Sequence, residues 1–440
     1  MTATIDHSAV ANKLTPAGPA EAFDLNMTEA SFTKIADLVR QYGDICRVPS
    51  SRSHDSYLIN HPDYVKHVLL RNHENYTKGV GFDRVKMLLG NGIIVSDGPF
   101  WRRQRRMMQP SFNRKVIGKL SEQIQRCNLE LFENWQQLAE KETVIDISKV
   151  SSELALQIVL RALFSDDLDE IIERHGHNPF SILTEDMTRD IKLVLKFREL
   201  SQILLDLISK RRTENPERVD FLTMFLSSRD KATGEAMTDR ELLDELMTMI
   251  IAGHETSAIT LNWVWYFLSE YPDIEKKVHE EVDKARYENI PAFENLDQLN
   301  FVKQVVEEAL RYYPPVWLFT RRAINDDQIG EYDIPAGSNI FISPYYLHRH
   351  ADFWSDVERF DPERFSEEAV KKQHKQAYIP FSVGPRRCVG DFFAQVEMQM
   401  HIGLMARHFR LQRVDNAPVE LAPEINMRNK HPLMMKIVKR

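Results

Sequence analysis

The sequence predicts a helix-rich fold of the mainly α (α+β) class, in which long helices and short strands occupy separate stretches of the chain. Between residues 100 and 230 most apolar side chains recur at helical spacing, as in LSEQIQRCNLELFENWQQLA. Short β-like runs occur near residues 55–60, within residues 315–365, and after residue 411. Because strands do not alternate with helices, a parallel sheet built from βαβ units is not expected.

The elements are expected in the following order. SYLI, at residues 56–59, is expected to be a strand, and HPDYVKHVLLRN after it a helix. A long helix is expected from Thr238–Asp239 to Pro272, and its nearly all-round apolar composition predicts a central, buried position. DQLNFVKQVVEEALRYYP is expected to form a further helix that ends at Pro314.

The composition indicates an ordinary globular protein. The chain has 440 residues, a formal net charge of −8, 43% hydrophobic residues and 28% charged residues. This acidic balance gives no support to a general nucleic-acid-binding role. Residues 1–22 are expected to be a flexible leader and residues 23–440 a single domain, because no repeat or long linker divides the chain.

The cysteines and the start of the chain indicate a cellular location. Cys46, Cys127 and Cys388 are scattered, which fits neither a disulfide framework nor a paired zinc motif and favours a reducing compartment. The chain does not open with a signal peptide or an apolar run of ~20 residues. We therefore expect a cytoplasmic, monomeric protein without a membrane anchor.

The segment FSVGPRRCVGDFFAQVEMQM places Cys388 in a Gly/Pro loop directly before an apolar helix. Unpaired backbone N–H groups at a helix start, with Arg386 and Arg387 nearby, favour a thiolate over a thiol. Gly384 and Gly390 would let the backbone approach a flat, bulky group, which suits an iron ligand better than a hydrolase nucleophile. For an isolated cysteine, a buried structural role is the alternative.

The run Phe381-x-x-Gly384-x-Arg386-x-Cys388-x-Gly390 resembles the haem-binding loop of the cytochrome P-450 family of haem-thiolate monooxygenases. The resemblance implies that Cys388 ligates the iron of haem b, that Arg386 binds a propionate, and that Phe381 packs near the sulfur. It also implies a helix-rich triangular domain with a small β-rich lobe, and a haem buried between the central helix and the cysteine loop.

The run AGHETS, residues 252–257, resembles the oxygen-binding segment of the same family. Gly253 would permit a local opening of the central helix in which O2 and water sit. The resemblance implies that Thr256 holds a proton network and that Glu255 links it to solvent, since dioxygen activation needs acid. Without the cysteine loop, a helix kink with satisfied polar groups would be the favoured interpretation.

Two further segments resemble the parts of the family that bind haem propionates. In WRRQR, Trp101 and Arg105 share a helical face and are assigned to this role. In TRRA, Arg321 is favoured by spacing, and Arg322 stays open. Arg103 and Arg106, together with Arg387, would form either a basic surface for an acidic electron-transfer partner or a solvated helix face.

A structural motif is also implied by the resemblance. Glu308 and Arg311 lie three residues apart and can pair on one helical face. In the family this pair is buried and joined by a downstream arginine, which here corresponds to Arg364 of PERF. We expect the three residues to support the haem loop and to take no part in catalysis. Arginine is required for bidentate contacts.

The expected reaction is insertion of one oxygen atom from O2 into a hydrophobic small molecule, or its oxidative coupling. Electrons from NAD(P)H would come through a separate ferredoxin or flavodoxin with its reductase. Fatty acids, terpenoids, steroids, macrolides and aromatic compounds stay open as substrates. The resemblance implies a substrate pocket that includes Phe82, Met249, Ala252, Val316, Trp317 and Phe319.

Other functions fit the sequence less well. A peroxide-driven peroxygenase or a haem-thiolate isomerase is disfavoured by Glu255–Thr256, and a non-catalytic haem sensor ranks last. Residues 79–84 lack the third glycine of a dinucleotide fingerprint, so nicotinamide binding by this chain is not expected. The His175/His177 and His348/His350 pairs are expected to be solvated rather than metal ligands.

Overall fold

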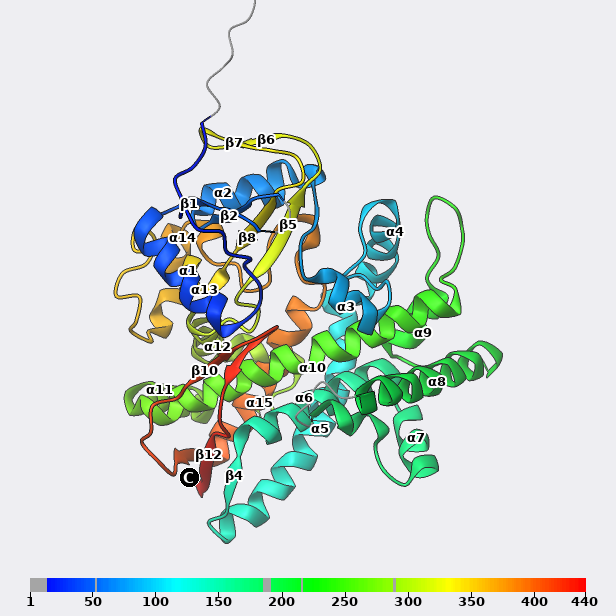
Figure 1. Ribbon diagram of the computed structural model, residues 1–440. Coiled ribbons are helices and arrows are strands. Elements are labelled where there is room, and N and C mark those ends of the chain that lie inside the picture. The colour runs from blue at the N-terminus through cyan, green and yellow to red at the C-terminus, as the bar shows by residue number, and fades with distance from the viewer. Residues whose placement is uncertain (1–13, 52–53, 185–190, 215–216, 288–289) are drawn as a thin grey trace, which may run out of the picture.

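The computed structural model describes residues 14–51, 54–184, 191–214, 217–287 and 290–440 (Figure 1). Long helices dominate these residues and the strands form small separate sheets, which confirms the predicted fold class. Residues 1–13 of the predicted leader lie outside the described residues.

Helices make up most of the described chain. The α-helices are α1 (Glu29–Tyr42), α2 (Pro62–Lys66), α3 (Phe82–Leu89), α4 (Gly98–Met108), α5 (Arg114–Glu140), α6 (Ile147–Phe164), α7 (Asp167–His175), α8 (Ile191–Glu214), α9 (Phe221–Ser227), α10 (Asp239–Glu270), α11 (Pro272–Lys284), α12 (Asn300–Tyr312), α13 (Pro344–Leu347), α14 (Glu367–Lys372) and α15 (Asp391–His408). The short helical turns used below are the π-helical η1 (His67–Arg71) and the 3-10 turns η6 (Pro362–Phe365) and η8 (Gly384–Arg386).

The strands are β1 (Ile45–Val48), β2 (Ser56–Ile59), β3 (Tyr76–Lys78), β4 (Val144–Asp146), β5 (Phe319–Ala323), β6 (Asp327–Ile329), β7 (Tyr332–Ile334), β8 (Asn339–Ile342), β9 (Phe409–Arg413), β10 (Leu421–Pro423), β11 (Met427–Asn429) and β12 (Met434–Lys439). The largest sheet has the order β1-β2-β8-β5-β3, in which β2 and β8 are parallel and the other neighbours antiparallel. In Figure 1 this sheet lies at one end of the molecule and the long helices fill the other.

The long helix α10 begins and ends where the sequence predicts. Thr238 and Glu241 form a reciprocal capping box at its start, and Pro272 opens the next helix directly after its end. Figure 1 shows α10 crossing the middle of the molecule, where it packs against α6, α8, α12 and α15. Large apolar side chains such as Trp263 and Trp265 are buried on it. The helix is therefore the central element of the core.

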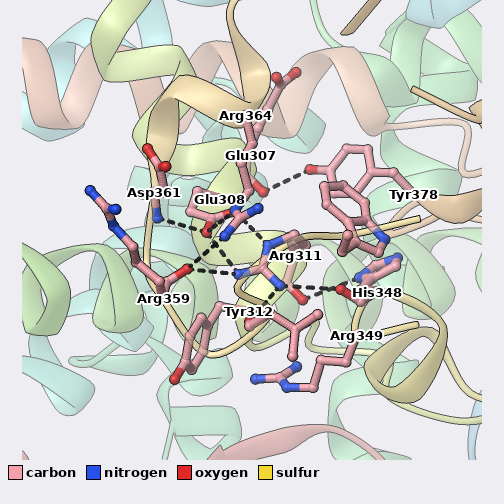
Figure 2. A network of polar contacts seen from close by, with 12 residues as sticks. Glu307, Glu308, Arg311, Tyr312, His348, Arg349, Arg359, Asp361, Arg364 and Tyr378 are labelled. Atoms are coloured by element: carbon pink, nitrogen blue, oxygen red, sulfur yellow. Dashed lines mark hydrogen bonds and ion pairs between the residues drawn. The ribbon is translucent and has the colours of Figure 1, made fainter. Parts of the chain in front are cut away.

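The predicted buried ion network is present (Figure 2). Arg311 donates two hydrogen bonds to Glu308, of 2.6 and 2.8 Å, and both side chains are fully buried. Arg364 of η6 joins them, with its Nε 3.4 Å from Glu308 Oε1. Arg311 also donates to the carbonyl oxygens of His348 (3.1 Å) and Val357 (3.0 Å). The network ties α12 to the segment that leads into the cysteine loop.

His348 corrects the expectation of a solvated histidine, because it is completely buried in this network. Its Nε2 accepts the backbone N–H of Ile379 at 2.9 Å, so its Nδ1–H donates to the carbonyl oxygen of Arg311 at 3.2 Å. Burial lowers the pKa of His348 to about 3, which keeps the ring neutral. Ile379 precedes Phe381 by two residues, so this histidine fixes the start of the cysteine loop.

Candidate functional site

The middle of α10 carries an accessible face inside an otherwise buried helix. Met249, Ala252, Gly253 and Thr256 are partly exposed, whereas most residues on both flanking stretches of α10 are buried. These four positions are spaced by three, one and three residues, so they share one side of the helix. Because α10 lies in the core, this accessible face borders an internal space rather than the outer surface.

The AGHETS run stays helical in the structure. The Thr256 hydroxyl donates to the carbonyl oxygen of Ala252 at 2.8 Å, and α10 continues as an α-helix through Gly253, so the expected opening is not seen here. A Cβ atom on Gly253 would lie 2.9 Å from Val159 Cγ2 of α6. The glycine therefore has a packing role, which is to let α6 approach α10 closely. Glu255 is partly exposed, as a link to solvent requires.

Glu397 is a residue at this site that sequence reasoning missed. It is buried on α15, and the hydroxyl of Ser257, the neighbour of Thr256, donates to its carboxyl group. Burial raises the pKa of Glu397 to about 8, so the acid is largely neutral at pH 7. A single acidic residue within the apolar run FFAQVEMQM was the available signal. It links the helix after Cys388 to the AGHETS run.

The shape of the cysteine loop is fixed by its backbone. The Cys388 N–H donates to the carbonyl oxygen of Phe381 at 2.9 Å, and the 3-10 turn η8 lies between them. Gly384 has a φ of 76°, and a Cβ atom there would lie 2.1 Å from the carbonyl oxygen of Leu69. Gly390 is less confined, because a Cβ atom there would have Phe112 as its nearest neighbour, at 3.9 Å.

Cys388 lies in an enclosed but accessible position. Water-sized molecules can reach it, yet burial raises the pKa of its thiol to about 11. The N–H of Gly390 and the charges of Arg105 and Arg387 lower this pKa but do not outweigh burial. This corrects the expectation that the helix start and the arginines alone favour a thiolate. The chain needs a further positive charge, such as a metal ion, to hold the sulfur ionised.

Three cations gather at one side of the site. Lys78 of β3 and Arg321 of β5 are directly paired in the strand register, and Arg386 of η8 lies near both. Burial and the charge of Arg386 lower the pKa of Arg321 to about 10. Burial and the two arginines lower the pKa of Lys78. Asp97 is the carboxylate that faces this cluster among the described residues. Counted by formal charge, the three cations of the cluster therefore exceed its one carboxylate by two.

Arg386 is held firmly within this cation cluster. It donates to the carbonyl oxygen of Ser96 at 3.0 Å, pairs with Asp97, and its guanidinium lies 4.1 Å from the ring centre of Trp101. Trp101 is therefore brought to the site through Arg386, as the sequence assignment requires.

The structure distinguishes Arg321 from Arg322. Arg321 is buried and faces Lys78 and Arg386, whereas Arg322 is exposed and its Nε lies 3.4 Å from Asn339 Oδ1. Successive residues of a strand point to opposite faces, so only one of the two can join the cluster. Lys78, in contrast, was missed, because its pairing with Arg321 depends on strand register that the sequence does not display.

Arg105, which the resemblance assigns to a propionate, contacts the cysteine loop. Its Nη1 donates to the carbonyl oxygen of Arg387 at 2.8 Å, and its charge acts on Cys388 rather than on the cation cluster. The expected basic surface is also largely paired within the chain. Arg103 contacts Glu241 at 2.8 Å, Arg106 contacts Asp230 at 3.0 Å, and Arg387 contacts Asp391 at 2.6 Å.

The expected pocket residues are brought together only in part. Phe82, at the start of α3, has the Lys78 ammonium 4.5 Å from its ring centre, and Arg321 lies 5.3 Å from the ring centre of Phe319. Met249 and Ala252 lie on the accessible face of α10, and Val316 is partly buried against the sheet core. Trp317 is fully buried in another cluster, where its indole N–H donates to the carbonyl oxygen of Glu424 at 2.7 Å.

Comparison with known proteins identifies the family. The family model described as Cytochrome P450 matches residues 20–437 of the chain. The chain belongs to the cytochrome P450 family. It is therefore an oxidoreductase that uses a haem cofactor, as the cysteine loop predicted.

Named relatives of this P450 come from plants and bacteria. It is 30% identical to "Protein LUTEIN DEFICIENT 5, chloroplastic" of Arabidopsis thaliana over 94% of the chain and 75% of the relative. It is 32% identical to "Cyclooctat-9-en-7-ol 5-monooxygenase" of Streptomyces melanosporofaciens over 85% of the chain and 83% of the relative. A crystal structure of the cytochrome P450DA heme domain superposes with a TM-score of 0.83 at 21% identity, covering 97% of this chain and 98% of that one.

The residues of this P450 fit a haem. Cys388 is accessible, enclosed and in need of a positive partner, which an iron ion supplies. The excess of two positive charges around Lys78, Arg321 and Arg386 matches the two propionate groups of a haem.

Within the described residues, no helix is both long enough and apolar enough to cross a membrane.

Proposed function

We propose that this P450 binds haem b through Cys388, with Lys78, Arg321 and Arg386 on its propionates, and inserts one oxygen atom into an apolar small molecule. The observation that carries the proposal is the combination of an enclosed cysteine with a cation cluster that lacks two negative charges. The Cys388 sulfur lacks a cation that would hold it ionised, and buried basic side chains without carboxylate partners are costly. A haem satisfies both at once.

The protein groups around the haem would hold and direct it. When bound, the haem supplies the activation of O2. The N–H of Gly390 and the charge of Arg105 stabilise negative charge on the Cys388 sulfur. Arg386, fixed by Asp97 and stacked on Trp101, sets the position of one propionate.

Thr256 and Glu255 would control protons on the α10 side. The Thr256 hydroxyl donates to the carbonyl oxygen of Ala252, so its oxygen is free to accept a further hydrogen bond from the internal space. Glu255 is partly exposed next to it and is the group that exchanges protons with solvent. Both residues therefore act as positioning and proton-transfer groups.

The substrate is proposed to be a terpenoid or a similarly apolar ring compound. Met249, Ala252 and Val316 present apolar surface to the site. Relatives carry names such as "Pentalenene oxygenase" and "Carotene epsilon-monooxygenase, chloroplastic", at 30% and 27% identity. These names support an apolar hydrocarbon skeleton without selecting one compound.

Electrons are proposed to come from NAD(P)H through a separate ferredoxin or flavodoxin and its reductase. Arg387 directly precedes Cys388 in the cysteine loop, and its side chain is half-exposed. We propose that the electron-transfer partner binds to the surface around Arg387. We also propose a cytoplasmic location. Its support is that Cys46, Cys127 and Cys388 are all free thiols.

Turnover of a terpenoid panel under 18O2 tests this function. With NAD(P)H, a surrogate ferredoxin and its reductase, we expect a product that carries one labelled oxygen atom. The Thr256→Ala variant should lower product formed per NAD(P)H by about tenfold or more and release hydrogen peroxide instead, because proton delivery is impaired. The matched Thr260→Ala variant, one turn along α10, should retain wild-type coupling. Product formed only with added peroxide would instead indicate a peroxygenase.

A further inference from the structure

The segment between α3 and α4, residues 90–97, is bound at its start by two acidic residues of α10. We call this segment the strap. The N–H of Asn91 donates to Asp244 Oδ2 at 2.8 Å, and the N–H of Ile93 donates to Glu245 Oε2 at 2.9 Å. Two consecutive carboxyl groups therefore hold two backbone amides of one short segment.

The strap lies directly against α10. A Cβ atom on Gly90 would lie 2.1 Å from Asp244 Oδ1, and one on Gly92 would lie 2.1 Å from Thr248 Oγ1. Gly90 also has a φ of 68°, which side chains rarely adopt. The glycines thus allow the backbone to come within reach of the acidic side chains.

The far end of the strap is bound to the cysteine loop. Arg386 donates to the carbonyl oxygen of Ser96 at 3.0 Å and pairs with Asp97. Asp97 also accepts the N–H of Lys78 at 3.0 Å. The strap therefore connects α10 with the cation cluster.

The strap covers one end of the accessible face of α10. Glu245, Thr248, Ala252 and Thr256 are spaced by three, four and four residues, so they lie on the same side of the helix. Glu245 and Thr248 are buried beneath the strap, whereas Ala252 and Thr256 are accessible. Ile93 of the strap is buried in the main core at this end. The helix α3, which leads into the strap, packs against α10 (Figure 1).

Among the described residues, Glu245 forms no ion pair with a cation. Its Oε1 accepts the side-chain amide of Gln104 of α4 at 3.2 Å, and the side chain is completely buried. The other charged groups nearby are Asp244 and Glu241 on its own helix, Arg103 of α4, which pairs with Glu241, and Arg240 and Lys86, which act on Asp244. Burial and the two neighbouring acids raise the pKa of Glu245 to about 7, against the hydrogen bonds from Ile93 and Gln104, which lower it.

We propose that Glu245 is a positioning residue of the site, whose protonation state sets how firmly the strap closes the end of the accessible α10 face. This inference rests on the proposed function only in assigning that face to the substrate. A strap that opens and closes there would control exchange of an apolar ligand at this end of the site.

The direction of the pH effect follows from the difference in hydration of the Glu245 carboxyl group between the closed and the open strap. When the strap is closed, Glu245 is buried and its pKa is about 7; when the strap lifts, water reaches it and its pKa falls toward 4.5. Protonation therefore favours the closed strap. The opening equilibrium rises by up to about tenfold per pH unit between these two values and is constant above them.

Hydrogen–deuterium exchange of the haem-loaded protein tests the inference. The exchange rate of the strap peptides, divided by the intrinsic exchange rate, should rise by up to about tenfold per pH unit between about pH 5 and about pH 7. Above about pH 7 this ratio should stay constant. In Glu245→Gln, whose side chain stays neutral, the profile should be flat and exchange at about pH 8 slower than in the wild type. Glu397→Gln, which removes another buried acid, should leave the wild-type strap profile unchanged.

Two results would overturn the inference. One is a wild-type exchange rate of the strap peptides, divided by the intrinsic rate, that does not vary with pH. This result would overturn the inference even if Glu245→Gln does not fold. The other is a Glu245→Gln protein with the wild-type profile. Neither result alters the ligation of haem by Cys388, so failure of the inference is distinguishable from failure of the proposed function.

Discussion

Single side chains decide what this site can bind, and neighbouring residues of the same type have different roles. Arg321 and Arg322 illustrate this: strand geometry sends one into the cation cluster and the other to the surface. Cys388 illustrates the balance of forces at this scale, because burial outweighs the helix start and two arginines in setting its thiol pKa. The chemistry of each residue depends on what surrounds it more than on its type.

The paired arginines give a direct test of the cation cluster. Arg321→Gln should lose haem faster than the wild type by roughly 10- to 100-fold, since a hydrogen bond to a charged group contributes about 1.5–3 kcal/mol. Arg322→Gln makes the same chemical change on the opposite face of β5 and should retain haem normally. Transfer of haem to apomyoglobin measures both rates. Equal loss from the two variants would contradict the assignment.

Glu397 gives a second test at this scale, through the dependence of stability on pH. Its pKa is raised from 4.5 to about 8 in the folded chain, so the folded state binds its proton more tightly than the unfolded state. This contribution is complete below about pH 4.5 and is lost as pH rises toward 8, with a slope of up to about 1.4 kcal/mol per unit. Urea unfolding of Glu397→Gln across this range should show a shallower pH dependence than the wild type. Parallel curves would contradict a protonated Glu397.

Helices and strands bring these residues together. Some features of these elements can be predicted from the sequence, and others cannot. The bounds of α10 follow from the capping box at Thr238, the apolar run and Pro272, all of which are local signals. The pairing of β3 with β5, which joins Lys78 to Arg321, is a contact between distant parts of the chain and carries no local signal. Glu245 is similar, since its partners lie on the strap and on α4.

The contact between α6 and α10 is tested by filling the space that Gly253 leaves. A Cβ atom there would approach Val159 Cγ2 to 2.9 Å, so Gly253→Ala should destabilise the fold by about 1–3 kcal/mol despite the better helix propensity of alanine. Adding Val159→Ala should recover much of that loss. Denaturant unfolding of the two single variants and the double variant measures the coupling. Additive effects would argue against a steric contact.

At the scale of the whole molecule, the fold builds two parts of the candidate site separately. The cysteine loop is fixed by Leu69, by His348 and by the Glu308–Arg311 network, and the accessible face of α10 is fixed by α6 and α15. The family and the fold class could be predicted, and Cys388 could be singled out as a candidate ligand, because their motifs are contiguous in sequence. Lys78 and Glu397 could not, because each depends on packing between distant segments.

The central claim is that Cys388 is the ligand of the haem iron, and the absorbance difference spectrum of the reduced protein with carbon monoxide tests it most directly. The wild type and a Cys46→Ser control are expected to show the long-wavelength Soret band of a thiolate-ligated haem. Cys388→Ser is expected to lose that band, because a neutral hydroxyl cannot donate charge as a thiolate does. A thiolate band that persists in Cys388→Ser, or its absence from the wild type loaded with haem, would contradict the account.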